Sequence, residues 1–353
     1  MSSIFVYIIM TSRLKYNKIS HTPIGRIVVF IIWVFLCITS GWVTDCADLD
    51  NYRNGYENTS LTELYITSFN NPGFNYLISV FQRMGVSFDI FHILFFICII
   101  TYLVWFVWKY SERPAIVLLL YIAVAFIGDI IQMKNTLALV FLYIALTGII
   151  DRNNEYNKLV TAIIILISAT IHIGFLVYLV ILLYDKKINN TFYIIFMMTI
   201  SIAGHSILQI FTHYAVLLDA DRMVGRAEGY LANGSVFSVF ACSFVYFLNL
   251  FTCNHFFRYL KGSNIRVDRL TNINVLISVI IIFSSVNMTF FRLFRNIILF
   301  NSVFIINGYS QSKKNAIDLL IVVFYFFVMS YFFLLTGDIW DNVAIIFQNN
   351  SLF

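Results

Sequence analysis

Long apolar runs alternate with short polar loops along almost the whole chain. The runs cover residues 24–43, 88–108, 115–131, 136–150, 159–184, 191–210, 236–257, 273–290, 296–306 and 317–336. A helix of about 20 apolar residues spans the hydrocarbon core of a bilayer, which is about 30 Å thick. The pattern therefore predicts an all-α, polytopic integral membrane protein, with residues 1–353 forming a single membrane domain.

The run at 159–184 is longer than the others. As one helix it would measure about 39 Å at about 1.5 Å per residue, so it fits either one tilted span or two short helices that break near His172 and Gly174. If the N-terminus is cytoplasmic, two crossings put Lys186 and the basic loop at 258–269 on the cytoplasmic side, where such residues concentrate, and one crossing puts them outside. We therefore predict about eleven transmembrane helices, a cytoplasmic N-terminus and a C-terminus on the outer side.

The composition excludes a soluble fold. Hydrophobic residues make up 60% of the chain and charged residues 12%, about half the share in an average soluble domain. The net charge of +5 comes mainly from Lys and Arg in short loops, which is typical of cytoplasmic loops rather than of a surface that binds nucleic acid. The cysteines form no Cys-x-x-Cys pair, and the chain has no P-loop, dinucleotide-binding or zinc-protease motif. We therefore expect no disulfide framework, no metal and no cofactor.

Two long segments, 44–87 and 211–235, fall on the outer side in this topology. Both carry acidic residues among apolar ones, so we expect them to be partly helical and to lie on the membrane surface. The triplets Asp48-Leu-Asp50 and Asp219-Ala-Asp221 contain carboxylate pairs of the kind that hold Mg²⁺ between substrate phosphates. A solvated acidic loop is the simpler explanation of such short triplets, and we assign no metal to them.

Ionisable residues inside or beside the apolar runs are the main functional clue, because charge at membrane depth is costly and usually functional. These residues are Asp89, His92, Asp129, Lys134, His172, His205, Arg292 and Arg295. The predicted topology puts Lys134, His172 and the two arginines at the outer side, where the acidic segment after the first span also lies. Separate parts of the chain thus deliver charged groups to one side of the membrane.

Two of these positions have more than one interpretation. Arg292 and Arg295 are three residues apart, so they share one face if this segment is helical. With Lys134 nearby they would bind phosphate groups well, although arginines at a helix end also act as snorkelling anchors. His172 lies in the most apolar stretch, where a neutral imidazole could act as a base, orient a hydroxyl group or simply pack between helices. The residues alone leave these alternatives open.

Five short motifs follow one another along the chain. They are Asp48-x3-Tyr52-x3-Tyr56, Asn71-Pro72-Gly73-Phe74, Gln132-Met133-Lys134 before Leu137-Ala138, Ile171-His172, and Phe291-Arg292-Leu-Phe-Arg295. Their order, spacing and sidedness resemble those of the EpsG-like family, a branch of the Wzy-type polysaccharide polymerases. The likeness runs from about Asp48 to about Ile306. Lys134 stands where that family usually has Arg, and Asn71 stands where it usually has an acidic residue.

The resemblance implies a multi-pass glycosyltransferase of the bacterial inner membrane that works at the outer leaflet. It would join oligosaccharide repeat units carried on undecaprenyl pyrophosphate into O-antigen or capsular polysaccharide. Its partners would be these lipid-linked sugars, with a flippase and a chain-length regulator of the same pathway, and nucleic acid would not be among them.

The resemblance also implies roles for seven residues of the motifs. The expected pyrophosphate ligands are Arg292, Arg295 and Lys134. The expected catalytic residues are His172 and, as the alternative base, Asp48. The expected sugar-stacking residues are Tyr52 and Tyr56.

Other classes of membrane protein fit the pattern less well. A flippase for the same lipid-linked sugar would hold its charges near the membrane midplane, between two related halves of the chain, and the sequence has neither feature. An O-acyltransferase that modifies the same glycans would need an acyl-donor site on the cytoplasmic side, where the sequence offers little besides loop lysines and arginines. A chain-length regulator would carry a large outer coiled coil, which the pattern does not predict.

Overall fold

The computed structural model describes residues 22–58, 71–153, 155–186, 193–197, 199, 236–260, 264–286, 288–312, 315–335 and 338–352. Within these residues the regular secondary structure is helical, and extended segments pair only in two isolated antiparallel bridges, Val43 with Asn350 and Asp151 with Ile265. The prediction of an all-α protein is confirmed for this part of the chain.

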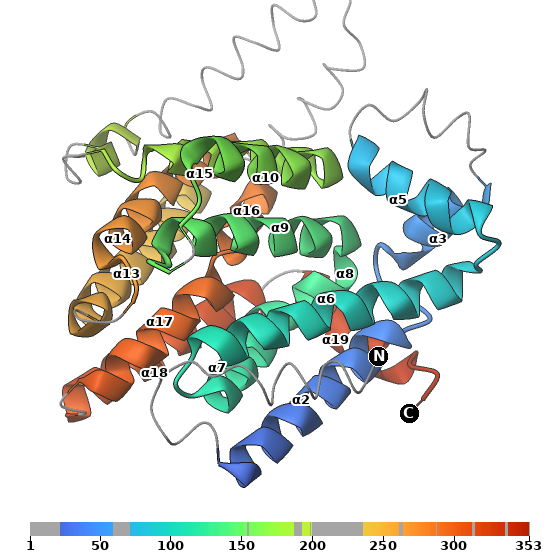
Figure 1. Cartoon of the computed structure of the whole chain (residues 1–353), viewed down its shortest axis with the longest axis horizontal. Coiled ribbons are helices and arrows are strands. Elements are labelled where there is room, and N and C mark those ends of the chain that lie inside the picture. Colours follow the sequence, from blue (N-terminus) through green and yellow to red (C-terminus); the bar gives the residue numbers. More distant parts are fainter. Residues whose placement is uncertain are drawn as a thin grey trace, which may run out of the picture.

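Figure 1 shows the helices of the described residues, which form one bundle. The first ten are α2 (Pro23–Gly41), α3 (Leu49–Asn58), α5 (Pro72–Arg83), α6 (Phe88–Tyr110), α7 (Pro114–Tyr121), the π-helix η1 (Ile122–Phe126), α8 (Ile127–Ile131), α9 (Met133–Ile150), α10 (Lys158–Ile171) and the 3₁₀-helix η2 (Ile173–Leu183). The later ones are α13 (Val236–Phe257), η3 (Arg258–Leu260), α14 (Val267–Leu276), η4 (Ile277–Val279), α15 (Ile280–Val286), η5 (Met288–Phe291), α16 (Arg292–Arg295), α17 (Ile298–Gln311), α18 (Ala316–Phe333) and α19 (Asp338–Gln348).

Local sequence signals explain where several helices begin. All three prolines of the chain, Pro23, Pro72 and Pro114, stand at the first position of a helix, where a backbone N–H is not needed. Asn157 and Asn315 cap α10 and α18, because each side chain accepts a hydrogen bond from the N–H three residues later, at 2.9 and 2.7 Å. These caps lie next to the starts of two predicted apolar runs.

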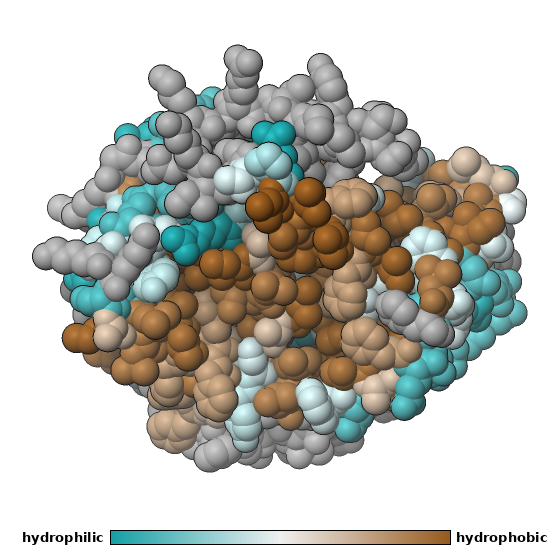
Figure 2. Space-filling model, turned by 90° about the horizontal axis from the view of Figure 1, so that it is seen from below, coloured by the Kyte–Doolittle hydropathy of each residue, from teal (hydrophilic) through white to brown (hydrophobic). Residues whose placement is uncertain are grey.

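Six helices in the described part of the chain are long and apolar enough to cross a membrane. They are Pro23–Gly41, Phe88–Tyr110, Pro114–Ile131, Met133–Ile150, Phe240–Leu260 and Ala316–Phe333. Each of them overlaps an apolar run of the sequence. Figure 2 shows hydrophobic residues over the middle of one face, with hydrophilic residues towards its left and right sides. The prediction of a polytopic membrane protein is therefore confirmed.

The longest apolar run folds back on itself. α10 ends at Ile171 and η2 begins at Ile173, with the backbone of His172 extended between them. The Lys158 ammonium lies 2.8 Å from the Asp185 carboxylate, so the far ends of the two helices meet. The structure thus confirms two short helices with a break at His172, and it excludes one straight tilted helix.

The connections gather at two opposite ends of the bundle. At the left of Figure 1, the loop after α9 meets the segment that leads into α14, where Arg266 and Arg269 each bind Glu155 at 2.6 Å. At the right of the same view lie α3, α5 and the C-terminal end of the chain. The basic loops and the acidic segment after the first helix are therefore separated by the length of the bundle.

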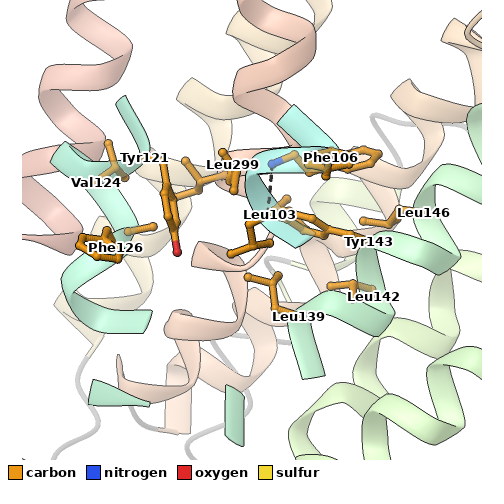
Figure 3. Close-up of a cluster of buried hydrophobic side chains, with 14 of the residues drawn as sticks. Leu103, Phe106, Tyr121, Val124, Phe126, Leu139, Leu142, Tyr143, Leu146 and Leu299 are labelled. Carbon is orange, nitrogen blue, oxygen red and sulfur yellow. Dashed lines mark hydrogen bonds between the residues drawn. The ribbon is translucent and has the colours of Figure 1, made fainter. Parts of the chain in front are cut away.

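One continuous buried core runs through the bundle, and Figure 3 shows the part where α6, α7, η1, α9 and α17 meet. The ring of Phe106 stacks on Phe300 with centroids 5.8 Å apart, and the ring of Tyr143 contacts both. The Tyr143 hydroxyl accepts a hydrogen bond from the Phe300 N–H at 3.2 Å and donates one to the Asn296 carbonyl at 3.0 Å. It thus pairs two backbone groups that are costly to bury alone.

Short helices cover the right-hand end of the bundle. α3 and α5 confirm that the segment 44–87 is partly helical, whereas the predicted outer segment 211–235 lies outside the described residues. The chain end also returns to this place, because the Thr44 N–H donates to the Asn349 carbonyl at 2.8 Å and the Ala47 N–H to the Asn342 side chain at 2.9 Å. The apolar pattern did not predict α19, which is too short and too polar on one face to resemble a span.

Three predicted spans differ from the structure or lie beyond it. The span predicted at 273–290 begins earlier, with α14 at Val267, and continues through η4 and α15. The short span predicted at 296–306 is α17, which is 14 residues long. The span predicted at 191–210 lies largely outside the described residues. The count of eleven spans therefore stays a prediction.

Candidate functional site

Separate segments bring five of the predicted residues to the end of the bundle covered by α3 and α5. Tyr52 belongs to α3, and Asp48 stands just before that helix, where its carbonyl accepts the Tyr52 N–H at 3.1 Å. Lys134 lies in the first turn of α9, His172 in the turn between α10 and η2, and Arg292 in the one-turn helix α16. We call these five residues the charged site.

Aromatic faces hold the side chain of Lys134. Its ammonium lies 5.5 Å from the ring centroid of Tyr52 and 5.4 Å from that of Phe74, distances at which a cation is attracted to the ring face. The two rings pack edge to face with centroids 6.0 Å apart. The carboxylate of Asp48 also acts on Lys134 electrostatically. The ammonium thus has both an acidic neighbour and two aromatic neighbours.

The phenol of Tyr52 stays neutral in this environment. Burial and the nearby Asp48 carboxylate raise the pKa of Tyr52 well above its usual range, while a hydrogen bond with the Lys134 backbone and the charge of Arg292 oppose that shift. Tyr52 is therefore a hydrogen-bonding group and an aromatic surface, and it does not serve as a base at physiological pH.

His172 lies in the turn outside both neighbouring helices. Its Nδ1 accepts a hydrogen bond from the Gly174 N–H at 3.2 Å, so the neutral ring carries its proton on Nε2. Burial lowers the pKa of His172 to about 4, and the charges of Arg292 and Lys134 act in the same direction. The imidazole is therefore neutral at physiological pH, with an Nε2–H donor left to offer.

Arg292 acts on two other residues of the charged site. Its side chain is half-buried, and its charge acts electrostatically on both Tyr52 and His172. The Asn71 side chain adds a further tie, because it accepts a hydrogen bond from the Ile173 N–H at 3.4 Å and so joins the segment before α5 to the turn of His172. The predicted convergence of Lys134, His172 and Arg292 is thus seen in the structure.

Arg295 lies behind the charged site and not in it. The side chain is almost fully buried, and its Nη2 lies 3.3 Å from the Asp129 carboxylate and 3.0 Å from the Gln132 side-chain oxygen. The other carboxylate oxygen of Asp129 accepts the Tyr121 hydroxyl at 2.9 Å. Gly128 makes room for the guanidinium, because a Cβ atom there would collide with it. Whether Arg295 also binds pyrophosphate stays a prediction.

Tyr56 lies apart from the charged site. Its ring is buried against Phe88 and Phe91, with centroids 5.6 and 5.2 Å away, and its hydroxyl donates to the Val86 carbonyl at 2.8 Å. These contacts fasten α3 to α6. The prediction that Tyr56 stacks on a sugar is untested.

Asp129 is one of the ionisable candidates and Gln132 belongs to a motif, but neither had a predicted role. The other polar residues around α16 that had none are Tyr121, Asn135, Tyr143, Tyr178 and Asn296. Asn135 and Asn296 exchange two side-chain hydrogen bonds, at 2.8 and 3.1 Å. The available signal was the position of amide side chains directly beside Lys134 and Arg295 within apolar sequence, since a buried amide needs a partner.

The charged site combines two cations, an acid, a neutral imidazole and an aromatic face. Such a set can bind an anionic group, donate hydrogen bonds and accept one proton. Among the described residues, no group of three or more His, Cys, Asp or Glu side chains is arranged to hold a metal ion.

The comparison with known proteins identifies one family. The model of the EpsG family matches residues 26–344, which is nearly the whole chain and includes every residue of the charged site. No curated protein and no solved structure matches the chain.

Proposed function

The chain belongs to the EpsG family, and we propose that it is a polysaccharide polymerase that joins undecaprenyl-pyrophosphate-linked oligosaccharide repeat units. The reaction takes place at the outer leaflet of the bacterial inner membrane, and the product is O-antigen or capsular polysaccharide. A flippase supplies the repeat units and a chain-length regulator acts on the product. The observation that carries this proposal is the convergence of the charged site at one end of a membrane bundle.

The proposed orientation puts the charged site on the outer side of the inner membrane. Lysines and arginines concentrate in cytoplasmic loops, and the loops around Arg266 and Arg269 lie at the opposite end of the bundle. We propose eleven transmembrane helices in a single membrane domain, with a cytoplasmic N-terminus and an outer C-terminus. One of the eleven, the span at 191–210, lies largely outside the described residues.

In the proposed reaction, a hydroxyl oxygen on the terminal sugar of a new repeat unit attacks the anomeric carbon of the growing chain. The bond between that carbon and the phosphate oxygen breaks, and undecaprenyl pyrophosphate leaves with the bonding electrons. Negative charge develops on the leaving oxygen, so cations placed there stabilise the transition state. Lys134 and Arg292 are the two cations of the charged site, and we assign them to the pyrophosphate.

The two cations bind phosphate groups in different ways. Arg292 has the planar fork that binds two phosphate oxygens at once, whereas Lys134 supplies a point charge. The aromatic faces of Tyr52 and Phe74 hold that charge in place and keep it partly free of water. The Lys134 that stands in place of the more usual Arg therefore supports electrostatic rather than bidentate binding of the pyrophosphate.

The hydrogen bond from the Gly174 N–H supports an orienting role for His172 over a role as a base. Because Nδ1 is already an acceptor, the free nitrogen Nε2 carries a proton and donates. His172 is thus suited to orient the acceptor hydroxyl or a phosphate oxygen, and less suited to remove a proton. Asp48 is then the better base, and it receives the hydroxyl proton. The ring of Tyr52, beside Asp48, is the surface on which a sugar stacks.

A complementation experiment tests the proposal. A strain that lacks the gene should show a single repeat unit in place of a ladder when its surface polysaccharide is run on a gel, because units reach the outer leaflet but are not joined. The full chain should restore the ladder. Arg292→Ala should not, whereas Arg83→Ala, which removes an exposed arginine from the end of α5, should restore it like the wild type.

The other outcomes contradict the proposal. Loss of every repeat unit in the deletion strain would indicate a flippase. An unchanged ladder with altered antigenicity would indicate an O-acyltransferase. A normal ladder with Arg292→Ala, at wild-type protein levels, would remove Arg292 from the reaction.

A further inference from the structure

Polar interactions connect the one-turn helix α16 to three neighbouring segments. From helix η2, the Tyr178 hydroxyl donates a hydrogen bond to the Leu293 carbonyl. From helix α8, Asp129 forms an ion pair with Arg295. A helix of four residues has little stability of its own, because its first turn costs conformational entropy and gains few hydrogen bonds. Its position is therefore set by these ties.

The third neighbour is the start of α9, which is joined to the α16 segment by side-chain hydrogen bonds at two places. Gln132 accepts a hydrogen bond from Arg295 at 3.0 Å, and Asn135 exchanges two hydrogen bonds with Asn296. Gln132 and Asn135 stand on either side of Lys134 in the sequence. Their partners come three and four residues after Arg292. Side-chain hydrogen bonds thus link the segment that carries Lys134 to the segment that carries Arg292.

The ion pair between Asp129 and Arg295 is enclosed by the bundle. The two side chains are 4% and 1% exposed, and both oxygens of Asp129 are occupied, one by Arg295 and one by Tyr121. Within the apolar bundle, an arginine whose charge is balanced by a buried carboxylate has little charge left for a substrate at the surface. This geometry distinguishes Arg295 from the half-buried Arg292 three residues before it.

From these contacts we propose that Asp129, Gln132 and Arg295, together with the pair of Asn135 and Asn296, are positioning residues. They fix the distance between Lys134 and Arg292 so that both cations meet one pyrophosphate group. Arg295 acts through Arg292 and does not touch the substrate. This inference rests on the proposed function, because it concerns the cations assigned there.

The rate of an enzymatic reaction depends strongly on the positions of its catalytic groups. A displacement of about 1 Å in a catalytic group costs about 100-fold in rate. A change that lets α16 shift should therefore lower kcat strongly. It should leave KM for the lipid-linked donor nearly unchanged, because the same groups still reach the bound pyrophosphate but no longer match the transition state.

The test removes the charges of the ion pair one at a time and then together. The full-length protein is placed in lipid bilayers with a lipid-pyrophosphate-linked repeat unit, and kcat, KM and thermal unfolding are measured for Asp129→Asn, Arg295→Gln and the double variant. Each single change leaves one buried charge without its counter-charge. The double change removes both charges and keeps amide groups that can hydrogen bond with Tyr121 and Gln132. Arg292→Ala serves as the inactive reference.

We expect each single variant to lower kcat by about 100-fold, and the double variant to return to within about tenfold of the wild type. A folded double variant that is as inactive as Arg292→Ala would overturn the positioning role, because Arg295 would then be needed as a charge that meets the substrate. Normal chain extension by Arg292→Ala would instead overturn the assignment of Arg292 in the proposed function, and the positioning role with it.

A milder change keeps the inference testable if the double variant does not fold. Gln132→Leu removes one hydrogen bond to Arg295 without altering any charge. We expect Gln132→Leu to lower kcat by about tenfold at unchanged KM. A raised KM at unchanged kcat in Gln132→Leu would show that Gln132 binds the substrate itself and would contradict the inference.

Discussion

The hydroxyl of Tyr143 offers a test of how the buried polar ties stabilise this bundle. Tyr143→Phe removes one oxygen atom and keeps the ring that packs against Phe106 (Figure 3) and against Phe300. The change leaves the Asn296 carbonyl and the Phe300 N–H without the partner they share. The Phe300 N–H lies in the first turn of α17, where no carbonyl of the helix itself can accept it.

The expected cost follows from the two lost hydrogen bonds. A hydrogen bond inside a membrane protein is worth about 0.6 kcal/mol on average, and a buried group left unpaired costs about 1–3 kcal/mol. Tyr143→Phe should therefore lower the free energy of unfolding by about 1–3 kcal/mol. The matched control is Tyr76→Phe, which removes the hydroxyl from an exposed tyrosine of α5 and should have no effect.

The assay is the unfolding of the full-length protein in mixed detergent and SDS micelles, followed by intrinsic fluorescence. A loss below about 0.3 kcal/mol for Tyr143→Phe would refute the reasoning, because it is smaller than one average hydrogen bond of this kind. Since Asn296 follows α16 directly, the same variant should also extend chains more slowly than Tyr76→Phe.

Three further predictions follow from the contacts described. Gly128→Ala should lower the free energy of unfolding by about 1–3 kcal/mol and slow chain extension, because the added Cβ collides with the guanidinium of Arg295. Gly55→Ala adds a Cβ into open space and should do neither in the same assays. Because the pKa of His172 lies at about 4, the part of the activity that depends on it should persist as the pH falls from 7 to about 5 and be lost near 4, and the rate of His172→Gln should lack this step. Hydrogen bonds from two arginines lower the pKa of Glu155 below 4.5, so its stabilising effect should be present above that pH and disappear as the pH falls through the lowered value; the thermal midpoints of wild type and Glu155→Gln should converge there.

Local sequence pattern and charge predicted the long helices, the break at His172 and the convergence of the charged residues. The apolar runs predicted the long helices because a bilayer imposes a minimum length of apolar sequence. The break at His172 followed from the distribution of lysines and arginines, which only two short helices place on one side. The convergence of Lys134, His172 and Arg292 then followed from the order of the helices.

The roles within the site depend on contacts that sequence spacing does not contain. Arg292 and Arg295 are three residues apart, but α16 is a single helical turn between a 3₁₀-helix and a two-residue turn, and the two side chains have different surroundings. The partner of Arg295 is Asp129, which is 166 positions away. Tyr56 has the motif spacing of Tyr52, yet its ring packs into α6. Such long-range choices are made by packing.

The most direct test of the central claim is the reaction itself. Purified full-length protein in a bilayer, given undecaprenyl-pyrophosphate-linked repeat units as the only sugar source, should form a ladder of polymers and release one undecaprenyl pyrophosphate for each new linkage. We expect the wild type and Arg83→Ala to form the ladder, and Arg292→Ala to form none. Movement of the intact lipid-linked unit across the bilayer, with no joined product, would contradict it.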